Sequence, residues 1–209
     1  MGKYEPRAMV ARSRYQRWFP TLPAEVQAGV YTRMDELLRE EAEYCDRGNY
    51  AHMAQILTSI AIYEALQAHG ASEEEAFAAV SENMWAFLDP SGIQRLARLP
   101  FFMPLMKKAV PFWFRHGSGT GWRYTWHTDP SDEFHFECNE CIYAKTLGRR
   151  GLLKLGAMCC HADVINYGEL PYTDFVRTQT LCEGGEVCGF RFVRHATDAS
   201  DGWERTESI

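Results

Sequence analysis

The sequence predicts an α+β protein in which an N-terminal group of helices packs on a C-terminal antiparallel sheet of about four strands with covering helices. Two patterns carry this prediction. Apolar residues recur at helical spacing through the first half of the chain, and segments after residue 121 alternate and are rich in β-forming residues. We therefore divide the chain into a helical region (1–116), a cysteine-rich α+β region (117–195) and a polar tail (196–209) that we expect to be disordered.

The composition is that of one compact domain, or a core domain with a helical extension. The chain has 209 residues, of which 46% are hydrophobic. Its net charge of −6 argues against nucleic acid as a partner. Met1 to Val10 is too polar for a signal peptide, and three prolines and two lysines interrupt the longest apolar run, Leu99 to Phe114. We expect no membrane partner and a cytoplasmic location with reduced thiols.

The N-terminal region is predicted to be a series of helices. A basic, aromatic segment favours a short amphipathic helix ended by Pro20. Further helices are expected over about 21–46, 50–69 and 72–88; the last begins with the capping box of Ser72 and Glu75. We interpret His52 and His69 as ordinary helix residues.

The rest of the chain is predicted in the same way. Two short apolar helices or turns, 93–99 and 101–110, precede a flexible glycine-rich linker at 117–121. The expected sheet consists of one hairpin over 122–137 and a second over 174–194, the second joined at Gly184-Gly185. Helices over 141–147 and 152–167 lie between the hairpins and are expected to cover one face.

Six of the seven cysteines lie between Glu137 and Phe192, and an odd number fits free thiols rather than a disulfide framework. Cys160 and Asp163 are three residues apart, so they share a helix face. Cys138 and Cys141 form a Cys-x-x-Cys pair that could bind zinc with Cys159, Cys160, His161 or Cys188, although a second such pair is absent.

Three motifs carry a family resemblance. They are Cys141-Ile142-Tyr143 after a strand, Cys160-His161-Ala162-Asp163 on a helix, and Arg177-Thr178 followed by Gly184-Gly185 and Cys188-Gly189-Phe190-Arg191-Phe192. Together they resemble the L-2-amino-thiazoline-4-carboxylic acid hydrolase family over roughly residues 122–194. The family commonly has proline at the position of Ile142 and aspartate at that of Gly189. Because this chain differs at both positions, the resemblance does not identify the exact substrate. The last of these motifs, Gly184-Gly185 followed by Cys188-Gly189-Phe190, is also similar to 4-vinyl-reductase-type small-molecule-binding domains.

The resemblance implies a cofactor-independent hydrolase that opens a small cyclic amidine ring, such as 2-aminothiazoline-4-carboxylate, at a carbon–nitrogen bond. A cysteine is the strongest side-chain nucleophile for this step. We expect Cys160 to be the nucleophile and Asp163 to move protons, with Cys141 as the rival nucleophile and Cys188 lining the same pocket. The candidates for substrate binding are Arg177, Tyr143, His161 and Thr178; Arg177 could clamp a carboxylate or form a structural ion pair.

Two other functions stay open from the sequence: a non-catalytic small-molecule-binding or sensor domain, and an interaction module stabilised by zinc. A small-molecule partner is expected in the first two cases. The sequence also leaves a homo-oligomer open, and it does not identify the natural substrate.

Overall fold

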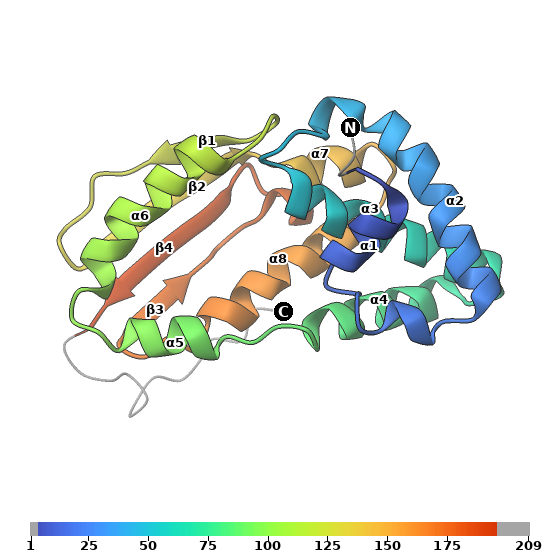
Figure 1. The fold of residues 1–209 in the computed structure, drawn as a ribbon. Coiled ribbons are helices and arrows are strands. Elements are labelled where there is room, and N and C mark those ends of the chain that lie inside the picture. The colour runs from blue at the N-terminus through green and yellow to red at the C-terminus, as the bar shows by residue number, and fades with distance from the viewer. Residues whose placement is uncertain (1–3, 196–209) are drawn as a thin grey trace.

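The computed structural model describes residues 4–195 and confirms the α+β class (Figure 1). The predicted tail at 196–209 lies outside these residues. The helical elements are α1 (Pro6–Arg12), α2 (Ala24–Glu40), α3 (Tyr50–Ala68), α4 (Glu73–Trp85), α5 (Ser91–Ala97), α6 (Phe102–Gly117), α7 (Ile142–Gly148) and α8 (Leu153–Tyr167), with short 3-10 turns η1 (Phe19–Thr21), η2 (Ala42–Tyr44) and η3 (Leu181–Glu183). The strands are β1 (Arg123–Trp126), β2 (Glu133–Glu140), β3 (Thr173–Val176) and β4 (Cys188–Arg194).

The four strands form one antiparallel sheet in the order β1-β2-β4-β3. Alternate residues of β2 are buried, as the period of two predicts. Phe134 and Phe136 lie opposite Phe192 and Phe190 of β4 in the register. These rings pack against α5, α6 and α8 on one face of the sheet. The prediction that helices 141–167 cover this face holds for α8, whereas α7 packs against α3 and α8.

The helical half is organised around α3, which contacts α1, α2, α4 and α7. Apolar spacing predicts five inward positions on this helix: Met53, Ile56, Leu57 and Ile60 are completely buried, and Leu66 is half-buried. The predicted capping box starts α4. Two predicted ends were too long. The first helix stops at Arg12 and α2 stops at Glu40. Among the described residues, no helix combines the length and apolarity needed to cross a membrane.

Helix α6 differs from the prediction of two short helices, the second of which was to end at Val110. It continues through Pro111 to Gly117, although proline lacks the N–H that a helix interior needs. Phe114, one turn beyond this proline, packs its ring against Tyr124 at 4.6 Å and Phe136 at 5.8 Å between centroids. Packing on the sheet therefore outweighs the local preference to stop.

The segment predicted to be a flexible linker is instead held by hydrogen bonds. Asp46 Oδ2 accepts from the backbone N–H of Thr120 at 2.6 Å, and Asn49 Nδ2 donates to the Thr120 carbonyl at 2.8 Å. A Cβ at Gly119 would lie 2.2 Å from Asp46 Oδ1, so only glycine fits here. The loop thus fixes the start of β1 against the helical half.

The second predicted hairpin has shorter strands and a longer connection than expected. Strand β3 ends at Val176, and the next residue, Arg177, turns its guanidinium towards α8. The connection to β4 contains η3 and turns at Gly184, whose φ of 87° suits glycine. This connection brings further side chains beside α8.

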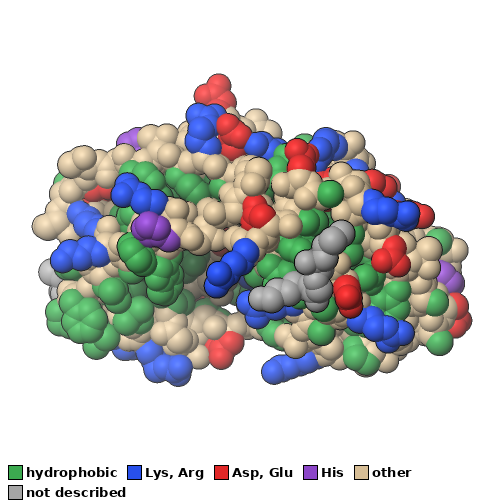
Figure 2. Space-filling view, turned by 45° about the horizontal axis from the view of Figure 1, so that its top comes forward, with side chains coloured by type: hydrophobic (Ala, Val, Ile, Leu, Met, Phe, Trp, Pro, Cys, Tyr) green, Lys and Arg blue, Asp and Glu red, His purple; other side chains and the backbone are tan. Residues whose placement is uncertain are grey.

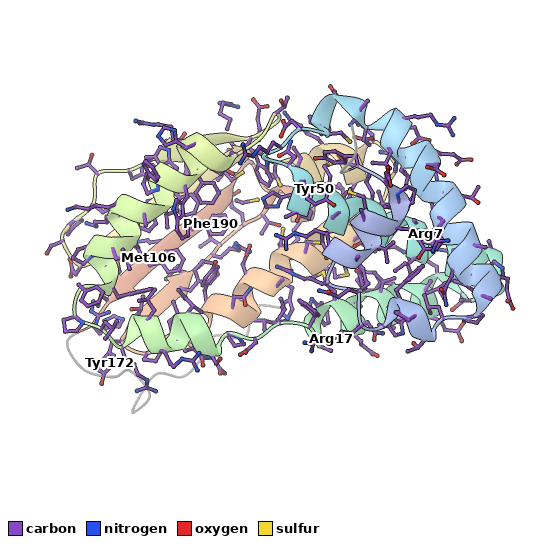
Figure 3. All side chains as sticks on the ribbon, in the orientation of Figure 1. Arg7, Arg17, Tyr50, Met106, Tyr172 and Phe190 are labelled. Carbon is purple, nitrogen blue, oxygen red and sulfur yellow. The ribbon has the colours of Figure 1, made fainter. Side chains whose placement is uncertain are left out.

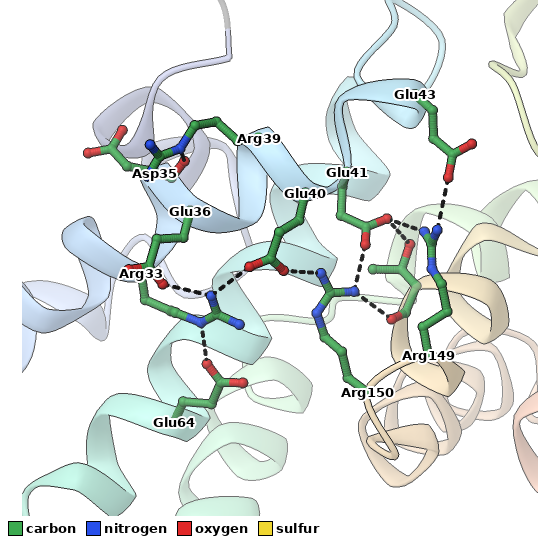
Figure 4. A network of polar contacts seen from close by, with 11 residues as sticks. Arg33, Asp35, Glu36, Arg39, Glu40, Glu41, Glu43, Glu64, Arg149 and Arg150 are labelled. Carbon is green, nitrogen blue, oxygen red and sulfur yellow. Dashed lines mark hydrogen bonds and ion pairs between the residues drawn. The ribbon is translucent and has the colours of Figure 1, made fainter.

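A network of ion pairs ties the end of α2 to α7 (Figure 4). The Glu41 side chain is only 2% exposed and accepts from Arg149 Nη2 at 2.5 Å and Arg150 Nη1 at 2.6 Å. Thr146 donates a further bond to Glu41 at 3.1 Å. A hollow of about 370 Å³ beside these groups is lined by Arg33, Glu40, Glu41, Arg149 and Arg150. Because its charges are already paired, we regard it as part of this structural network.

Candidate functional site

The structure brings together cysteines from three parts of the chain. The β2–β4 register sets Cys138 opposite Cys188, and these two residues form a buried cluster with Cys141, which caps the start of α7. Cys160 on α8 lies beside the thiols of Cys182 and Cys188. All seven cysteines are free. The three candidate cysteines 141, 160 and 188 are therefore neighbours in space.

Cys138 in β2 and Cys141 at the N-cap of α7 differ in the direction of their pKa shifts: the pKa of Cys138 is raised and that of Cys141 is lowered. The Cys138 thiol donates to the Glu140 carbonyl at 3.1 Å, so it must carry its proton. Cys138 is also the main cause of a lowered pKa at Cys141, and the nearby backbone N–H groups of Ala144 and Tyr143 act in the same direction. Burial opposes this effect. These effects lower the pKa of Cys141 below that of an ordinary cysteine and so ease formation of its thiolate.

The pKa of Cys160 is shifted in the opposite direction to that of Cys141. The neighbouring Cys182 thiol is the main cause that raises the pKa of Cys160, and burial adds to it. Cys188 and Thr180 act against this rise. The pKa of Cys188 is also raised, by Cys160 and by burial. Cys160 therefore needs a proton acceptor if it is to react as a thiolate.

The candidate proton acceptor is held by an arginine. Arg177 Nη2 donates to Asp163 Oδ2 and Nη1 donates to the Cys160 carbonyl, both at 2.8 Å. The guanidinium lies over the Phe190 ring at 4.4 Å (Phe190 is labelled in Figure 3). Its Nε is buried and has no hydrogen-bond partner within the described chain. Arg177 thus fixes the Asp163 carboxylate one helical turn from Cys160. Its Nε remains a donor without a hydrogen-bond partner among the described residues.

Several side chains here are surrounded by protein and yet reached by water. Asp163 keeps 33% of its side-chain exposure, although burial is the main cause that raises its pKa. Tyr143 and His52 are also half-buried, while burial raises the pKa of Tyr143 and lowers that of His52 to about 4. We infer that these groups border a recess. Figure 2 shows the surface hollowed between the sheet half and the helical half.

A row of aromatic side chains runs from the recess towards β1. His52 Nδ1 lies 3.3 Å from the Tyr143 hydroxyl, and the His52 ring packs on Trp122 at 4.9 Å between centroids. Trp122 stacks in turn on Tyr124 at 6.0 Å. These two rings contact the cysteine cluster on one side and line a hollow of about 310 Å³ between α6 and β1.

Two sequence-based candidates lie apart from this group. His161 is exposed and packs on Trp85 at 4.9 Å between centroids, as expected for a residue on another face of α8 than Cys160. Thr178 is exposed, whereas Thr180 is 1% exposed and lies beside Cys160. The motif threonine is thus not the threonine that borders the cysteines.

One group among residues 4–195 could hold a metal ion. Ligand atoms of His127, His135 and Glu137 all lie within 4.8 Å of one another. Glu137 and His135 alternate with the buried Phe134 and Phe136 of β2, so this group lies on the outer face of the sheet. The cysteines of the zinc hypothesis are not gathered in this way within the same residues.

These features define an α+β protein with a cluster of free thiols near a half-buried carboxylate–guanidinium pair. The chain belongs to the L-2-amino-thiazoline-4-carboxylic acid hydrolase family, whose model matches residues 49–192. This confirms the resemblance and extends it from the cysteine-rich half to the start of α3. Neither the curated proteins nor the solved structures contain a significant match.

Sequence reasoning missed several residues that border the site. His52 is interpreted from the sequence as an ordinary helix residue. Cys182 is not among the sequence-based candidates; it is 5% exposed and adjoins Cys160. Arg14 acts electrostatically on Asp163 from the segment after α1. A histidine among the apolar positions of α3 was the one available signal. Arg14 and Asp163 lie too far apart in the sequence for any local pattern to indicate their electrostatic interaction.

Proposed function

We propose that the protein hydrolyses a small cyclic amidine of the 2-aminothiazoline-4-carboxylate kind in the recess beside Cys160 and Asp163. The family membership supports the reaction class. One observation carries the site: a water-accessible but largely enclosed carboxylate is held at 2.8 Å by Arg177, one turn from a cysteine. Burial that raises the pKa of Asp163 makes this carboxylate a better proton acceptor at neutral pH.

The proposed first step is attack by Cys160 sulfur on the ring carbon between nitrogen and sulfur. A carbon–sulfur bond to the protein forms while the thiol proton passes to Asp163. The ring bond to nitrogen then breaks. The departing nitrogen takes that proton from Asp163 and a second proton from the exocyclic amino group, which becomes an imine on the carbon, so the nitrogen leaves as an amine. A water molecule next attacks the same carbon, and Cys160 sulfur leaves with a proton. The product is a carbamoyl-cysteine, and the net reaction adds one water.

Cys141 is the second candidate for the nucleophile. Its lowered pKa favours the thiolate without a separate base. It is 7% exposed, whereas Cys160 is half-buried and shares a helix face with Asp163. Access and the adjacent carboxylate favour Cys160.

The test is turnover of 2-aminothiazoline-4-carboxylate by the purified protein, followed by mass spectrometry for the gain of one water. Cleavage of the carbon–nitrogen bond frees an amine, and cleavage of the carbon–sulfur bond frees a thiol; the proposal requires the amine. A folded protein that binds the compound without converting it would support the sensor alternative. Zinc present in stoichiometric amount after purification under reducing conditions would instead favour the interaction module.

A further inference from the structure

Helix α6 lies along the sheet, with one side against the strands and the other side towards solvent (Figure 1). Its inward side chains Met106 (labelled in Figure 3), Val110 and Phe114 pack against the aromatic cluster of the sheet. A helix in this position normally carries polar and charged residues on its outward face. The outward face of α6 departs from that pattern.

Large apolar side chains occupy this outward face. Phe101, Leu105 and Phe112 follow one another at intervals of four and seven residues, so they share one side of the helix. Phe112 is 59% exposed, and the adjoining Trp113 is 70% exposed. With Leu99, these residues make up five of the nine exposed large hydrophobic side chains in the part of the chain that the structure describes. Apolar residues gathered in this way mark an interaction surface, whereas single exposed ones need no explanation.

The same part of the chain is basic. Residues 90–128 contain six lysines and arginines and no aspartate or glutamate, which gives a formal charge of +6. Since the whole chain has a net charge of −6, the remaining residues carry −12. The exposed Arg95, Arg98, Lys108 and Arg115 are in no ion pair among the described residues. In Figure 2, hydrophobic and basic side chains lie beside one another on the half of the molecule that carries α6.

The charged and apolar residues are interleaved on one side of the helix. Lys108 lies one turn from Leu105 and Phe112, and Arg115 lies one turn beyond Phe112. Long basic side chains can lay their carbon stems on apolar surface and extend the charge outward. Such a face fits the boundary of an anionic bilayer, where aromatic and aliphatic side chains enter the acyl region and basic groups meet phosphate.

Other partners fit this face less well. A symmetric dimer would use the same patch on both copies, so its cations would lie opposite one another. Proteins that bind single-stranded nucleic acid hold the strand in a basic groove, whereas the outward side of a single helix is convex. A broad surface with negative charge and an apolar layer beneath it matches both properties of the face.

We propose that the outward face of α6, together with Arg98 and Leu99 just before it, docks on an anionic phospholipid bilayer. The helix lies in the plane of the headgroups, with Phe112 and Trp113 entering the upper acyl region, and it does not cross the membrane. The expectation of no membrane partner rests on the lack of a spanning segment, which does not bear on binding at the surface. The inference is independent of the proposed reaction.

The experiment is co-sedimentation with vesicles of phosphatidylcholine alone, or of phosphatidylcholine with about 30% of the anionic lipid phosphatidylglycerol. Wild type should bind the anionic vesicles at least ~10-fold more tightly than the neutral ones, and added salt should weaken this binding by screening the headgroups. Phe112→Gln/Trp113→Gln removes apolar surface, and Lys108→Gln/Arg115→Gln removes charge. Each pair of substitutions should lower the affinity for anionic vesicles roughly 10-fold.

Two matched controls change the same kinds of residue elsewhere. Leu153→Gln/Val164→Gln replaces two exposed hydrophobic residues on α8. Arg12→Gln/Arg39→Gln replaces two exposed arginines of the helical half. Both controls should bind anionic vesicles like wild type. Circular dichroism checks that all variants keep the fold, as expected for substitutions of exposed residues.

Tryptophan fluorescence locates the contact. Trp113 is the most exposed tryptophan among the described residues, so wild type should show a blue-shifted emission on anionic vesicles. Trp113→Phe should lose most of this shift while still binding. An unchanged shift in Trp113→Phe would overturn the proposal.

Four further results would also overturn it: no vesicle binding, equal binding to neutral and anionic vesicles, unchanged binding by both pairs of α6 variants, or equal losses in the controls. A dimer in light scattering that Phe112→Gln/Trp113→Gln dissociates would assign the face to a second copy of the chain. Binding to single-stranded DNA in place of vesicles would assign it to nucleic acid. Either assignment refutes the bilayer as the partner. Because vesicle binding needs no turnover, failure of the proposed hydrolysis would leave this result unaffected.

Discussion

Arg177 holds Asp163 through a 2.8 Å hydrogen bond between Nη2 and Oδ2, across 14 residues of sequence. The same guanidinium binds the Cys160 carbonyl, so one side chain from the β3–β4 connection orients a whole turn of α8. The arginine side chain is 8% exposed. This pair fixes the Asp163 carboxylate one helical turn from Cys160, and 33% of the Asp163 side chain stays exposed.

The first prediction concerns Asp163. Asp163→Asn keeps the size of the side chain and removes its ability to accept a proton at the pH of the reaction. We expect kcat to fall by roughly 100- to 10,000-fold, the usual contribution of a positioned acid–base group, while KM changes little. Steady-state kinetics on 2-aminothiazoline-4-carboxylate measure both values.

The matched control is Asp174→Asn. Asp174 is 53% exposed and pairs with His195 at the edge of the sheet. Its substitution should leave kcat within about twofold of wild type, because exposed ion pairs contribute little. Near-normal turnover by folded Asp163→Asn would remove this residue from the mechanism.

The second prediction separates the cysteines. Cys160→Ser should lower turnover by roughly 1,000-fold or more, as expected when a nucleophile is removed, and Cys45→Ser, directly after η2, should not. If Cys160→Ser stays active and Cys141→Ser is inactive while folded, the nucleophile is Cys141. Mass spectrometry of protein quenched during turnover should locate the adduct on the same residue.

The third prediction concerns stability and pH. Burial lowers the pKa of His52 from 6.5 to about 4, so between these pH values the unfolded chain binds more protons at this position than the folded protein. The contribution of His52 to stability is therefore present above pH 6.5 and is lost as the pH falls towards 4. For one group this slope cannot exceed about 1.4 kcal/mol per pH unit.

His52→Gln removes the titrating group. Urea unfolding of wild type and variant at several pH values from 7 to 4 should give a shallower decline of the unfolding free energy for the variant. Parallel curves would show that the pKa of His52 is the same in the folded and the unfolded protein, contrary to its enclosed position.

The fourth prediction concerns the network in Figure 4. Glu41→Ala leaves the arginines at the end of α7 without their buried partner, and we expect a loss of about 3–5 kcal/mol in the free energy of unfolding. Glu36→Ala breaks a pair whose carboxylate is 49% exposed and should cost less than about 1 kcal/mol. If both variants lose the same unfolding free energy in urea, the burial of Glu41 does not make its ion pairs more important for stability than the exposed pair of Glu36.

Local patterns in the sequence were sufficient for much of the architecture. Apolar spacing predicted α3 and its buried face, Ser72 and Glu75 predicted the start of α4, and alternation predicted β2. The same local reasoning set Cys160 and Asp163 on one helix face. These features depend on residues within a few positions of one another, so periodicity and capping chemistry are enough to read them.

Only the tertiary structure decided which distant side chains meet. The β2–β4 register brought Cys138 to Cys188, the early end of β3 freed Arg177 to hold Asp163, and packing on the sheet carried α6 through Pro111. Arg14, in the N-terminal segment, acts electrostatically on Asp163. The sequence by itself therefore determined the elements and the family motifs, whereas the packing of helices on the sheet decided the composition of the site, because contacts between distant residues depend on burial and register rather than on local spacing.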